Sequence, residues 1–380
     1  MSLYQQLGIK RVVNADGTKT VLGGSLMPPE VLEAMREGAA WFVDLPELHR
    51  RAGRHIAQLI DCPAIEDAAI VCGAAAGLAV ATAACVAGTD GAKIHALPHL
   101  DWPGARDQVV IQRTHVTGFA QNYCNAGPRL VEIGGPEGAT PDEFAAAICE
   151  RTAAVTFLAG ELPGNARFAS KTSLAELVRL AHERGVPVIV DAAAELPPPE
   201  HLRLFNTLGA DLVVFSGGKG LRGPQASGMV LGQAGLVEAC RLNNNPHSSV
   251  GRPMKVGKEE ICGLVKAVEL YVTRDHAADL RTWDGWTRAI LDAAGTLDGI
   301  TAERVLARSI PQARITLDAA SGFTARQLAA ELAAGDPSIR VSLGADAITF
   351  NPHNMEPGDA ELIATRLRQV IHSRQPAAVH

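Results

Sequence analysis

The sequence lacks the patterns by which several classes of protein are identified. Its 7 cysteines are scattered without CxxC spacing, and residues 1–10 do not form a charged and apolar leader. We therefore expect a cytoplasmic protein in a reducing compartment, not an exported one held by disulfides. The most apolar stretch, 68–87, is rich in alanine and is interrupted by Gly73 and Gly77, so it is too weakly apolar for a membrane span.

Positive charge and aromatic residues are also sparse. The net charge is −6 with histidine neutral, and no run of Lys and Arg with interleaved aromatics occurs. Such runs follow a phosphate backbone, so we expect neither a nucleic acid nor a membrane as partner. We also predict no metal site. Aromatics make up 4 % of the chain but apolar residues 47 %, with Ala and Gly abundant. This balance is typical of helices packed closely on a parallel sheet.

Short apolar runs alternate with helical patterns through the first two thirds of the chain. Helical spacing is found at 28–40, 47–60 and 73–87, and strand-like runs at 70–71, 109–111, 130–133, 153–158, 186–190 and 212–215. Strands flanked by helices at this rhythm indicate βαβ units. We therefore predict an α/β fold with a mostly parallel central sheet flanked by helices.

The pattern changes after about Pro253. Two long helical patterns, three short strand-like runs and a closing helix follow, at 256–273, 277–294, 314–317, 339–343, 347–350 and 359–372. The strands predict a separate sheet in a smaller α+β domain. We divide the chain into an N-terminal segment (1–48), a large domain (49–253) and a small C-terminal domain (254–380).

A single lysine, Lys219, stands in the glycine-rich stretch VVFSGGKGLRGPQASGMV that begins at Val213. A nucleotide phosphate loop would need GxxxxGK followed by Ser or Thr. Here Val213 takes the place of the first glycine and Gly220 follows the lysine, and no GxGxxG joins a strand to a helix. Neither a phosphate loop nor a dinucleotide site is therefore favoured.

A lysine that forms a Schiff base with pyridoxal 5'-phosphate fits the stretch better. Such a lysine needs a strand end to aim it and small neighbours that admit the ring and phosphate. The ring nitrogen stays protonated only beside a buried carboxylate, which Asp191 supplies after an apolar run. Gly73, Ala74 and Ala75 open a helix whose N–H groups suit the phosphate. Taken singly, Asp191 would suit a helix cap, Gly73 to Ala75 tight packing, and Lys219 a solvated loop. Taken together, they favour this cofactor.

With these residues the sequence resembles the fold-type-I pyridoxal-phosphate enzymes. Within them it is similar to the branch of L-seryl-tRNA(Sec) selenium transferase and D-glucosaminate-6-phosphate ammonia-lyase. The resemblance covers nearly the whole chain and is carried by VVNADGT from Val12, CGAA from Cys72, VDAA from Val190, FSGGK from Phe215 with GPQ from Gly223, and GRPMKVGKEE from Gly251.

The resemblance implies a Schiff base on Lys219, a ring-nitrogen partner at Asp191, and phosphate contacts from Gly73, Ala74 and Ser216. It also implies a homodimer or higher homo-oligomer with sites at subunit interfaces. The large domain would bind the cofactor, and the N-terminal segment would pack with the small domain and the active site. The selenium transferase carries an N-terminal tRNA-binding portion for which this shorter chain has no room, so we do not expect a tRNA substrate.

Other site residues are open to more than one interpretation. His115 follows a strand where a group could lie over the cofactor ring or relay protons, and Tyr123 competes with it. Glu161 follows another strand, near the expected place of the cofactor's phenolic oxygen or the substrate. His115 would equally suit the role of an ordinary loop histidine, and Glu161 that of a surface carboxylate.

A substrate carboxylate needs an anchor, which arginine provides by two-point hydrogen bonding. Arg252 is our first candidate and Arg222 our second, although each would also suit an ordinary ion pair. Asn14 lies in a segment that, by the resemblance, folds over the active site. It would equally suit a turn, since Asn-Ala-Asp-Gly is a turn sequence.

The reaction expected is chemistry at the Cα of an amino acid or amino-sugar acid. Lys219, displaced by the substrate amine, would remove the Cα proton as general base while Asp191 keeps the ring cationic. By family analogy we predict β-elimination of the ammonia-lyase or dehydratase type. The alternatives are a racemase or epimerase, a β-replacement transferase, and a non-catalytic protein that binds the cofactor. The sequence does not identify the substrate, its phosphorylation or its stereochemistry.

Overall fold

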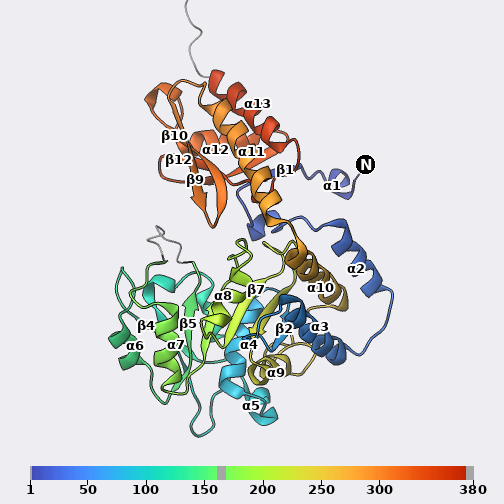
Figure 1. The fold of residues 1–380 in the computed structure, drawn as a ribbon, viewed down its shortest axis with the longest axis vertical. Coiled ribbons are helices and arrows are strands. Elements are labelled where there is room, and N and C mark those ends of the chain that lie inside the picture. Colours follow the sequence, from blue (N-terminus) through green and yellow to red (C-terminus); the bar gives the residue numbers. More distant parts are fainter. Residues whose placement is uncertain (1, 161–167, 374–380) are drawn as a thin grey trace, which may run out of the picture. The chain divides into compact units, whose positions relative to one another are not determined.

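The computed structural model describes residues 2–160 and 168–373 of the chain (Figure 1). Its contacts divide the chain into two compact units. The large unit is Ser25–Arg274, and the small unit combines Met1–Gly24 with Asp275–His380. Each unit has a sheet and a hydrophobic core of its own.

A seven-stranded sheet forms the centre of the large unit. Its strands lie in the order β2-β8-β7-β6-β5-β3-β4. The bounds are β2 (Asp67–Val71), β3 (Gln108–Gln112), β4 (Arg129–Ile133), β5 (Thr152–Leu158), β6 (Val188–Asp191), β7 (Leu212–Ser216) and β8 (Gly228–Gly232). Strand β8 runs antiparallel to β2 and β7 on its two sides, and the other strand pairs described in this sheet are parallel, so the predicted mostly parallel sheet is confirmed.

Helices cover both faces of this sheet, because successive strand residues point to opposite faces. In β6, Ile189 packs with the layer of α4 and α9, whereas Val190 packs with the layer of α3, α7 and α10. The helices of the unit are α2 (Pro29–Ala39), α3 (Leu45–Ile60), α4 (Ala74–Ala87), α5 (Gly91–Ala96), α6 (Pro141–Ala147), α7 (Leu174–His182), α8 (His201–Thr207), α9 (Ala234–Leu242) and α10 (Lys258–Thr273). Burial on both faces explains why the strands are continuous apolar runs.

The small unit has a five-stranded sheet in the order β1-β11-β12-β10-β9. Strand β1 pairs with β11 in parallel, and the other pairs are antiparallel. The elements are α1 (Leu3–Gln6), β1 (Val12–Ala15), α11 (His276–Ala294), β9 (Ile300–Ala307), β10 (Ile310–Leu317), α12 (Ala325–Ala334), β11 (Ser338–Leu343), β12 (Ala347–Phe350) and α13 (Asp359–His372). A separate sheet after the large unit is thus present, as the sequence predicted.

The compact units do not coincide with the segments 1–48, 49–253 and 254–380. Helices α2 and α10, which those segments assign outside the large domain, pack together within the large unit (Figure 1). Their contact is close, since a Cβ on Gly263 of α10 would lie 2.7 Å from Met35 Cγ of α2. Lys258 Nζ also donates a hydrogen bond of 2.7 Å to the Gly38 carbonyl. Packing that the sequence pattern does not encode therefore keeps both helices with the large unit.

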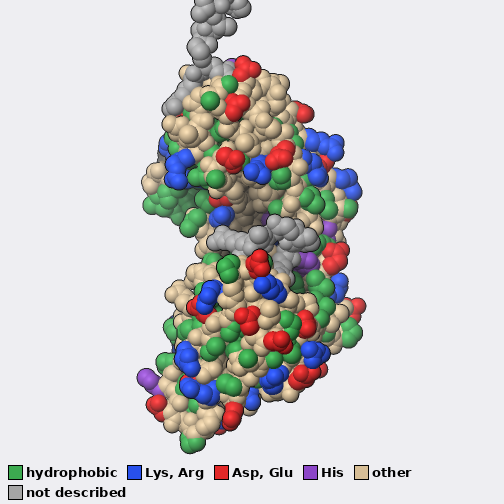
Figure 2. All heavy atoms as spheres, turned by 90° about the vertical axis from the view of Figure 1, so that its left-hand side faces the viewer, with side chains coloured by type: hydrophobic (Ala, Val, Ile, Leu, Met, Phe, Trp, Pro, Cys, Tyr) green, Lys and Arg blue, Asp and Glu red, His purple; other side chains and the backbone are tan. Residues whose placement is uncertain are grey.

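Charges of both signs are interspersed on the surface. The face of the large unit in Figure 2 shows Lys, Arg, Asp and Glu side chains side by side, without a field of one sign. No helix within the described ranges has the length and apolar character needed to cross a lipid bilayer.

Gly53 marks the closest approach of α3 to the sheet. A Cβ there would lie 2.0 Å from the Ala68 carbonyl oxygen and 2.8 Å from Arg241 Nη2. Arg241 is buried and pairs with Asp67, at 2.6 Å between Nη2 and Oδ2. A side chain at position 53 would therefore displace the strand or break a buried ion pair.

We expect Gly53→Ala to lower the free energy of unfolding by about 3 kcal/mol, because overpacking and a disturbed buried ion pair act together. The measurement is urea denaturation followed by circular dichroism. Gly235→Ala in α9 is the control, since its Cβ would meet no atom within 4 Å, and it should stay within about 1 kcal/mol of wild type. Equal stability of the two variants would contradict this account of α3.

Candidate active site

Three parallel strands of the large unit end at one edge of the sheet. Leu158 at the end of β5 pairs with Asp191 at the end of β6, and Asp191 pairs with Val214 of β7. Ser216, two residues further along β7, pairs with Gly228. Because carboxyl ends of parallel strands meet at one edge, side chains that follow these strands are brought together there.

The loop that carries Lys219 begins where β7 ends, and its glycines are needed for close backbone contacts. A Cβ on Gly217 would lie 2.0 Å from Ser227 Oγ, and one on Gly218 would lie 2.5 Å from Gln225 Cα. On the other side of the lysine, a Cβ on Gly220 would lie 2.3 Å from the Leu196 carbonyl oxygen. Side chains are therefore excluded around the lysine, and the backbone folds closely back on itself.

Hydrogen bonds hold this loop in one conformation. The Gly223 N–H donates to the Gly217 carbonyl at 2.8 Å, and the Arg222 N–H donates to the Lys219 carbonyl at 2.9 Å. Arg222 has a φ of +58°, in the left-handed region that few non-glycine residues adopt. Ser25 Oγ donates to the Gly218 carbonyl at 3.1 Å. Sequence reasoning missed this contact of Ser25, because no local pattern in the sequence predicts it.

Asp191 is a nearly buried carboxylate at the end of β6, with 8 % of its surface exposed. Its Oδ1 accepts a hydrogen bond of 3.0 Å from the Ala193 N–H. Tyr123 is buried close by. Burial first, and then the charge of Asp191, raise the pKa of Tyr123 well above its usual value, while a hydrogen bond with Thr156 opposes the shift. Tyr123 is therefore a neutral phenol beside the candidate acid.

The amino end of α4 lies at the same edge of the sheet. A Cβ on Gly228 would lie 2.9 Å from Gly73 C and 3.2 Å from Ala74 N, so the first turn of α4 sits against the start of β8. No side chain caps this helix, and Gly73 has a φ of +139° with open space where a Cβ would be. The first N–H groups of a helix have no intrahelical acceptor and attract anions. The arrangement fits a phosphate better than it fits tight packing.

His115 follows β3 and is held inside the protein. Its ring is 3 % exposed, and Nδ1 accepts a hydrogen bond of 3.0 Å from the Leu158 N–H. The ring proton is then on Nε2, which lies 3.3 Å from the Phe168 carbonyl oxygen. Burial lowers the pKa of His115 to about 4, although the Phe168 hydrogen bond opposes the shift. A neutral imidazole thus connects two backbone segments next to the candidate site.

The other predicted residues have different surroundings. Arg252 is exposed and donates from Nη1 to Asn245 Oδ1 at 3.2 Å. Asn14 lies in the small unit, where its side chain accepts from the Asp16 N–H and donates to the Gly17 carbonyl, which is the geometry of a turn residue. Glu161 lies outside the described residues. Nothing in residues 2–160 and 168–373 brings three His, Cys, Asp or Glu side chains together as a metal site.

Pyridoxal 5'-phosphate fits this edge of the sheet. The amino end of α4 suits its phosphate, and Asp191 is buried enough to stabilise a charged ring nitrogen. The half-buried Lys219 stands in a loop whose glycines admit a close ligand. The three features that the sequence predicted separately are therefore found at one edge of the sheet. Asp191 ends β6, the Lys219 loop follows β7, and α4 begins after β2.

Comparisons with known proteins agree with this geometry. Residues 121–290 match the family described as L-seryl-tRNA selenium transferase. The chain is 37 % identical to 5'-C-glycyluridine monooxygenase-decarboxylase from a Streptomyces species, over 97 % of this chain and 92 % of that protein. It is 31 % identical to D-glucosaminate-6-phosphate ammonia lyase from Salmonella typhimurium, over 97 % and 98 %. A solved structure of D-glucosaminate-6-phosphate ammonia-lyase superposes with a TM-score of 0.83 at 30 % identity, covering 98 % of this chain and 99 % of that chain. The predicted fold-type-I architecture is confirmed.

The buried neutral His115 predicts a dependence of stability on pH. Since its folded pKa of about 4 lies below the ordinary 6.5, the unfolded chain binds a proton first as pH falls. The stabilisation is complete above pH 6.5 and is lost toward pH 4, by about 3 kcal/mol. We expect His115→Gln to be less stable at pH 7 but to lose about 3 kcal/mol less than wild type over this range.

Urea denaturation at pH 7, 6, 5 and 4 measures this difference. His49 is also buried, with its pKa lowered to about 4, and it contributes in the same direction in both proteins. His99→Gln, at an exposed position, is the control and should follow wild type. A parallel loss of stability in wild type and His115→Gln would show that His115 does not stay neutral in the folded protein.

Proposed function

We propose that this chain, which belongs to the pyridoxal-phosphate-dependent family of D-glucosaminate-6-phosphate ammonia lyase and L-seryl-tRNA(Sec) selenium transferase, eliminates the β-hydroxyl of an amino acid or amino-sugar acid. The products would be a 2-keto acid and ammonia. The observation that carries the proposal is the meeting of Lys219, Asp191 and the uncapped end of α4 at one sheet edge. The substrate would be a small molecule, and the site of action the cytoplasm.

The residues at the sheet edge would share the binding of the cofactor. Pyridoxal phosphate, when bound, withdraws electrons from the Cα of an attached amino acid and so makes its proton acidic. The backbone N–H groups of Gly73, Ala74 and Ala75 would bind the phosphate, and the Ser216 hydroxyl would bind it as well. The Asp191 carboxylate would keep a proton on the ring nitrogen, which its burial beside the neutral Tyr123 favours.

Lys219 would act twice in this scheme. Its Nζ would hold the cofactor before substrate arrives, and afterwards the free amine would take the Cα proton. The β-hydroxyl would then leave with a proton as water, and hydrolysis of the resulting enamine would return one water and release ammonia. Water is consumed and formed in equal amounts, so the net products are the 2-keto acid and ammonia.

The remaining polar residues would recognise the substrate. Arg222 is half-buried, and its backbone N–H donates to the Lys219 carbonyl, so the residue is held in the same loop as Lys219. We propose that its guanidinium is the carboxylate anchor. Arg252 is exposed, which suits a site completed by a neighbouring subunit in the homodimer or higher homo-oligomer that we propose. Asn14 and Glu161 remain proposed substrate contacts. His115 would position the backbone at Leu158, at the end of the strand next to Asp191.

A second function deserves a direct comparison, because the Streptomyces relative has the higher identity of the two named above. Its name joins oxygenation to decarboxylation. Both reactions begin at the Cα of an amino acid, so the same lysine and carboxylate would serve either. Elimination releases ammonia and requires no oxygen, whereas oxygenative decarboxylation consumes oxygen and releases carbon dioxide. Racemisation or epimerisation releases neither gas nor ammonia, and β-replacement needs a second substrate.

We expect the purified protein, loaded with pyridoxal phosphate, to show the visible absorbance of a lysine-bound cofactor, and Lys219→Ala to lose it. D- and L-hydroxy amino acids and amino-sugar acids are then screened for an absorbance change, for ammonia and for oxygen uptake. Lys93→Ala, at a lysine of α5 in the large unit that lines neither the sheet edge nor any proposed contact, is the control and should match wild type.

The readouts separate the hypotheses. Ammonia with an equal amount of 2-keto acid supports elimination, and Lys219→Ala should be slower by at least about a thousandfold. Oxygen uptake with release of carbon dioxide supports the second function instead. Unchanged absorbance in Lys219→Ala would refute the role of this lysine, and a cofactor-loaded protein inactive on the whole panel would count against both reactions.

A further inference from the structure

Three consecutive apolar side chains project from the large unit between α2 and α3. Trp41, Phe42 and Val43 are 73 %, 102 % and 48 % exposed, and we call them the aromatic segment. Isolated exposed apolar residues are normal on a protein surface, but adjacent ones with two aromatic rings form a patch that favours association.

The aromatic segment is tied at both ends. Lys258 Nζ donates hydrogen bonds of 2.7 Å and 3.1 Å to the Gly38 and Ala39 carbonyls, which close the carboxyl end of α2. On the other side, Asp44 Oδ1 accepts from the Glu47 N–H at 2.7 Å and begins α3. Because the backbone on either side is already ordered, a partner would bind these rings at little cost in conformational entropy.

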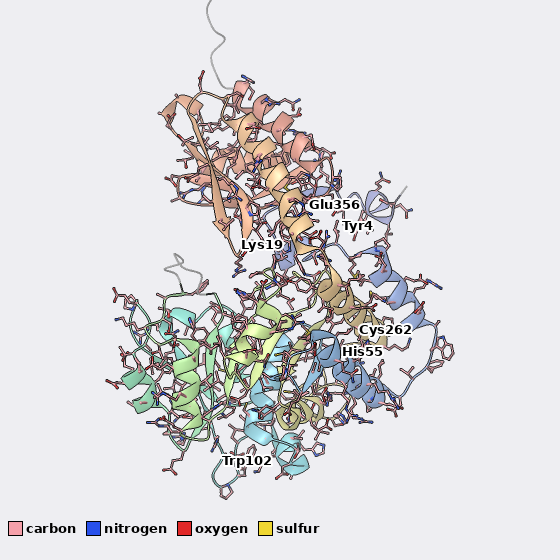
Figure 3. The ribbon with its side chains drawn as sticks, viewed as in Figure 1. Tyr4, Lys19, His55, Trp102, Cys262 and Glu356 are labelled. Carbon is pink, nitrogen blue, oxygen red and sulfur yellow. The ribbon has the colours of Figure 1, made fainter. Side chains whose placement is uncertain are left out.

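An apolar groove of about 350 Å³ opens on the same unit. Its wall is formed by α2, α3 and α10, which contribute Ala34, Leu48 and Val265 among others. His55 of α3 and Cys262 of α10 both line it, and Figure 3 shows these two residues close together on the neighbouring helices. The groove is wide enough to receive side chains of another chain. The aromatic segment of the same chain does not fill it, since its three side chains are exposed and do not line the groove.

The groove and the aromatic segment each have charged side chains that could pair across a subunit contact. Arg51 and Lys266 line the groove, whereas the exposed acids Glu37 and Asp44 flank the aromatic segment. Each of the two cations pairs with an acid of its own helix, but these pairs are solvent-accessible and worth little. They are able to exchange partners when another chain approaches.

We propose that a second copy of this chain covers the groove, with the aromatic segment of each copy inserted into the groove of the other. Such a contact is isologous, so the same surface is used twice about a two-fold axis. It specifies the surface of the homo-oligomer suggested under the proposed function and rests on that oligomer, though on none of the catalytic steps.

The area available is sufficient for a stable dimer. Two exposed aromatic rings bury roughly 300–500 Å² when they are covered. The walls that cover them bury a similar area, and the contact occurs twice in a two-fold dimer. The total of about 1,200–2,000 Å² is the size of a standard specific interface.

The first test is the mass of the protein in solution, by light scattering over a range of concentrations. We expect wild type to be a dimer or a multiple of two. Phe42→Asp should raise the dissociation constant of the dimer by at least about 100-fold, because each dimer loses two buried rings. Phe119→Asp is the control, since Phe119 is also in the large unit and is 60 % exposed. It should keep the wild-type mass.

The second test uses the native thiol in the groove. Val43→Cys places a thiol on the aromatic segment while both rings stay, and mild oxidation should join it to Cys262 of the other copy as a covalent dimer. Val43→Cys with Cys262→Ser should not cross-link, nor should Phe119→Cys. Gel electrophoresis without reductant is the readout, with wild type as the background for the other native cysteines.

Either of two results overturns the proposal. One is a wild-type monomer at micromolar concentration, which would leave the groove to a different protein. The other is an oligomer that Phe42→Asp does not weaken and Val43→Cys does not cross-link, which would place the subunit contact elsewhere. Circular dichroism and the absorbance of lysine-bound cofactor are recorded on every variant. A variant or wild type that lacks the absorbance of the bound cofactor would count against the proposed function. The mass of the same folded protein in solution would still test the subunit contact.

Discussion

The parallel register of β5, β6 and β7 is the constraint on which the candidate site depends. Asp191 reaches the sheet edge from which the Lys219 loop starts, because it pairs with Leu158 on one side and with Val214 of β7 on the other. Successive residues of a strand face opposite sides, so a slip by one residue would move the carboxylate to the wrong face of the sheet. The apolar side chains of these strands are buried on both faces, and their packing is what fixes the register.

Glycine has two distinct uses around this edge. In the Lys219 loop, Gly217 and Gly218 stand where a Cβ would clash, so they allow the backbone to fold on itself. At Gly73 the space for a Cβ is open, and the positive φ lets the chain turn from β2 into an uncapped helix end. The first use makes the loop compact, and the second leaves room for a ligand. Both are needed if a phosphate and a lysine are to meet one small molecule.

Burial decides the chemistry of the groups that sequence reasoning had left open. His115 and Tyr123 competed for one role beside the cofactor ring, but the structure gives them different surroundings. His115 is a neutral ring bound to backbone at Leu158 and Phe168, while Tyr123 is a neutral phenol near Asp191. Loop residues and spacing carry no information on solvent exposure, and solvent exposure is what sets the charge of a histidine.

The sequence by itself determined the α/β class and the mostly parallel sheet, and it singled out Gly73, Asp191 and Lys219 as candidate site residues, because strand periodicity and residue chemistry are local properties. It missed the edge strand β9, whose exposed Glu303 and Arg304 hide the apolar alternation, and it assigned α10 to the small domain. The tertiary structure alone decided that α10 packs with α2, that Ser25 donates a hydrogen bond to the Lys219 loop, and that the large unit has both the exposed Trp41 and Phe42 and an apolar groove. These facts depend on contacts between residues far apart in the chain, which no local pattern records.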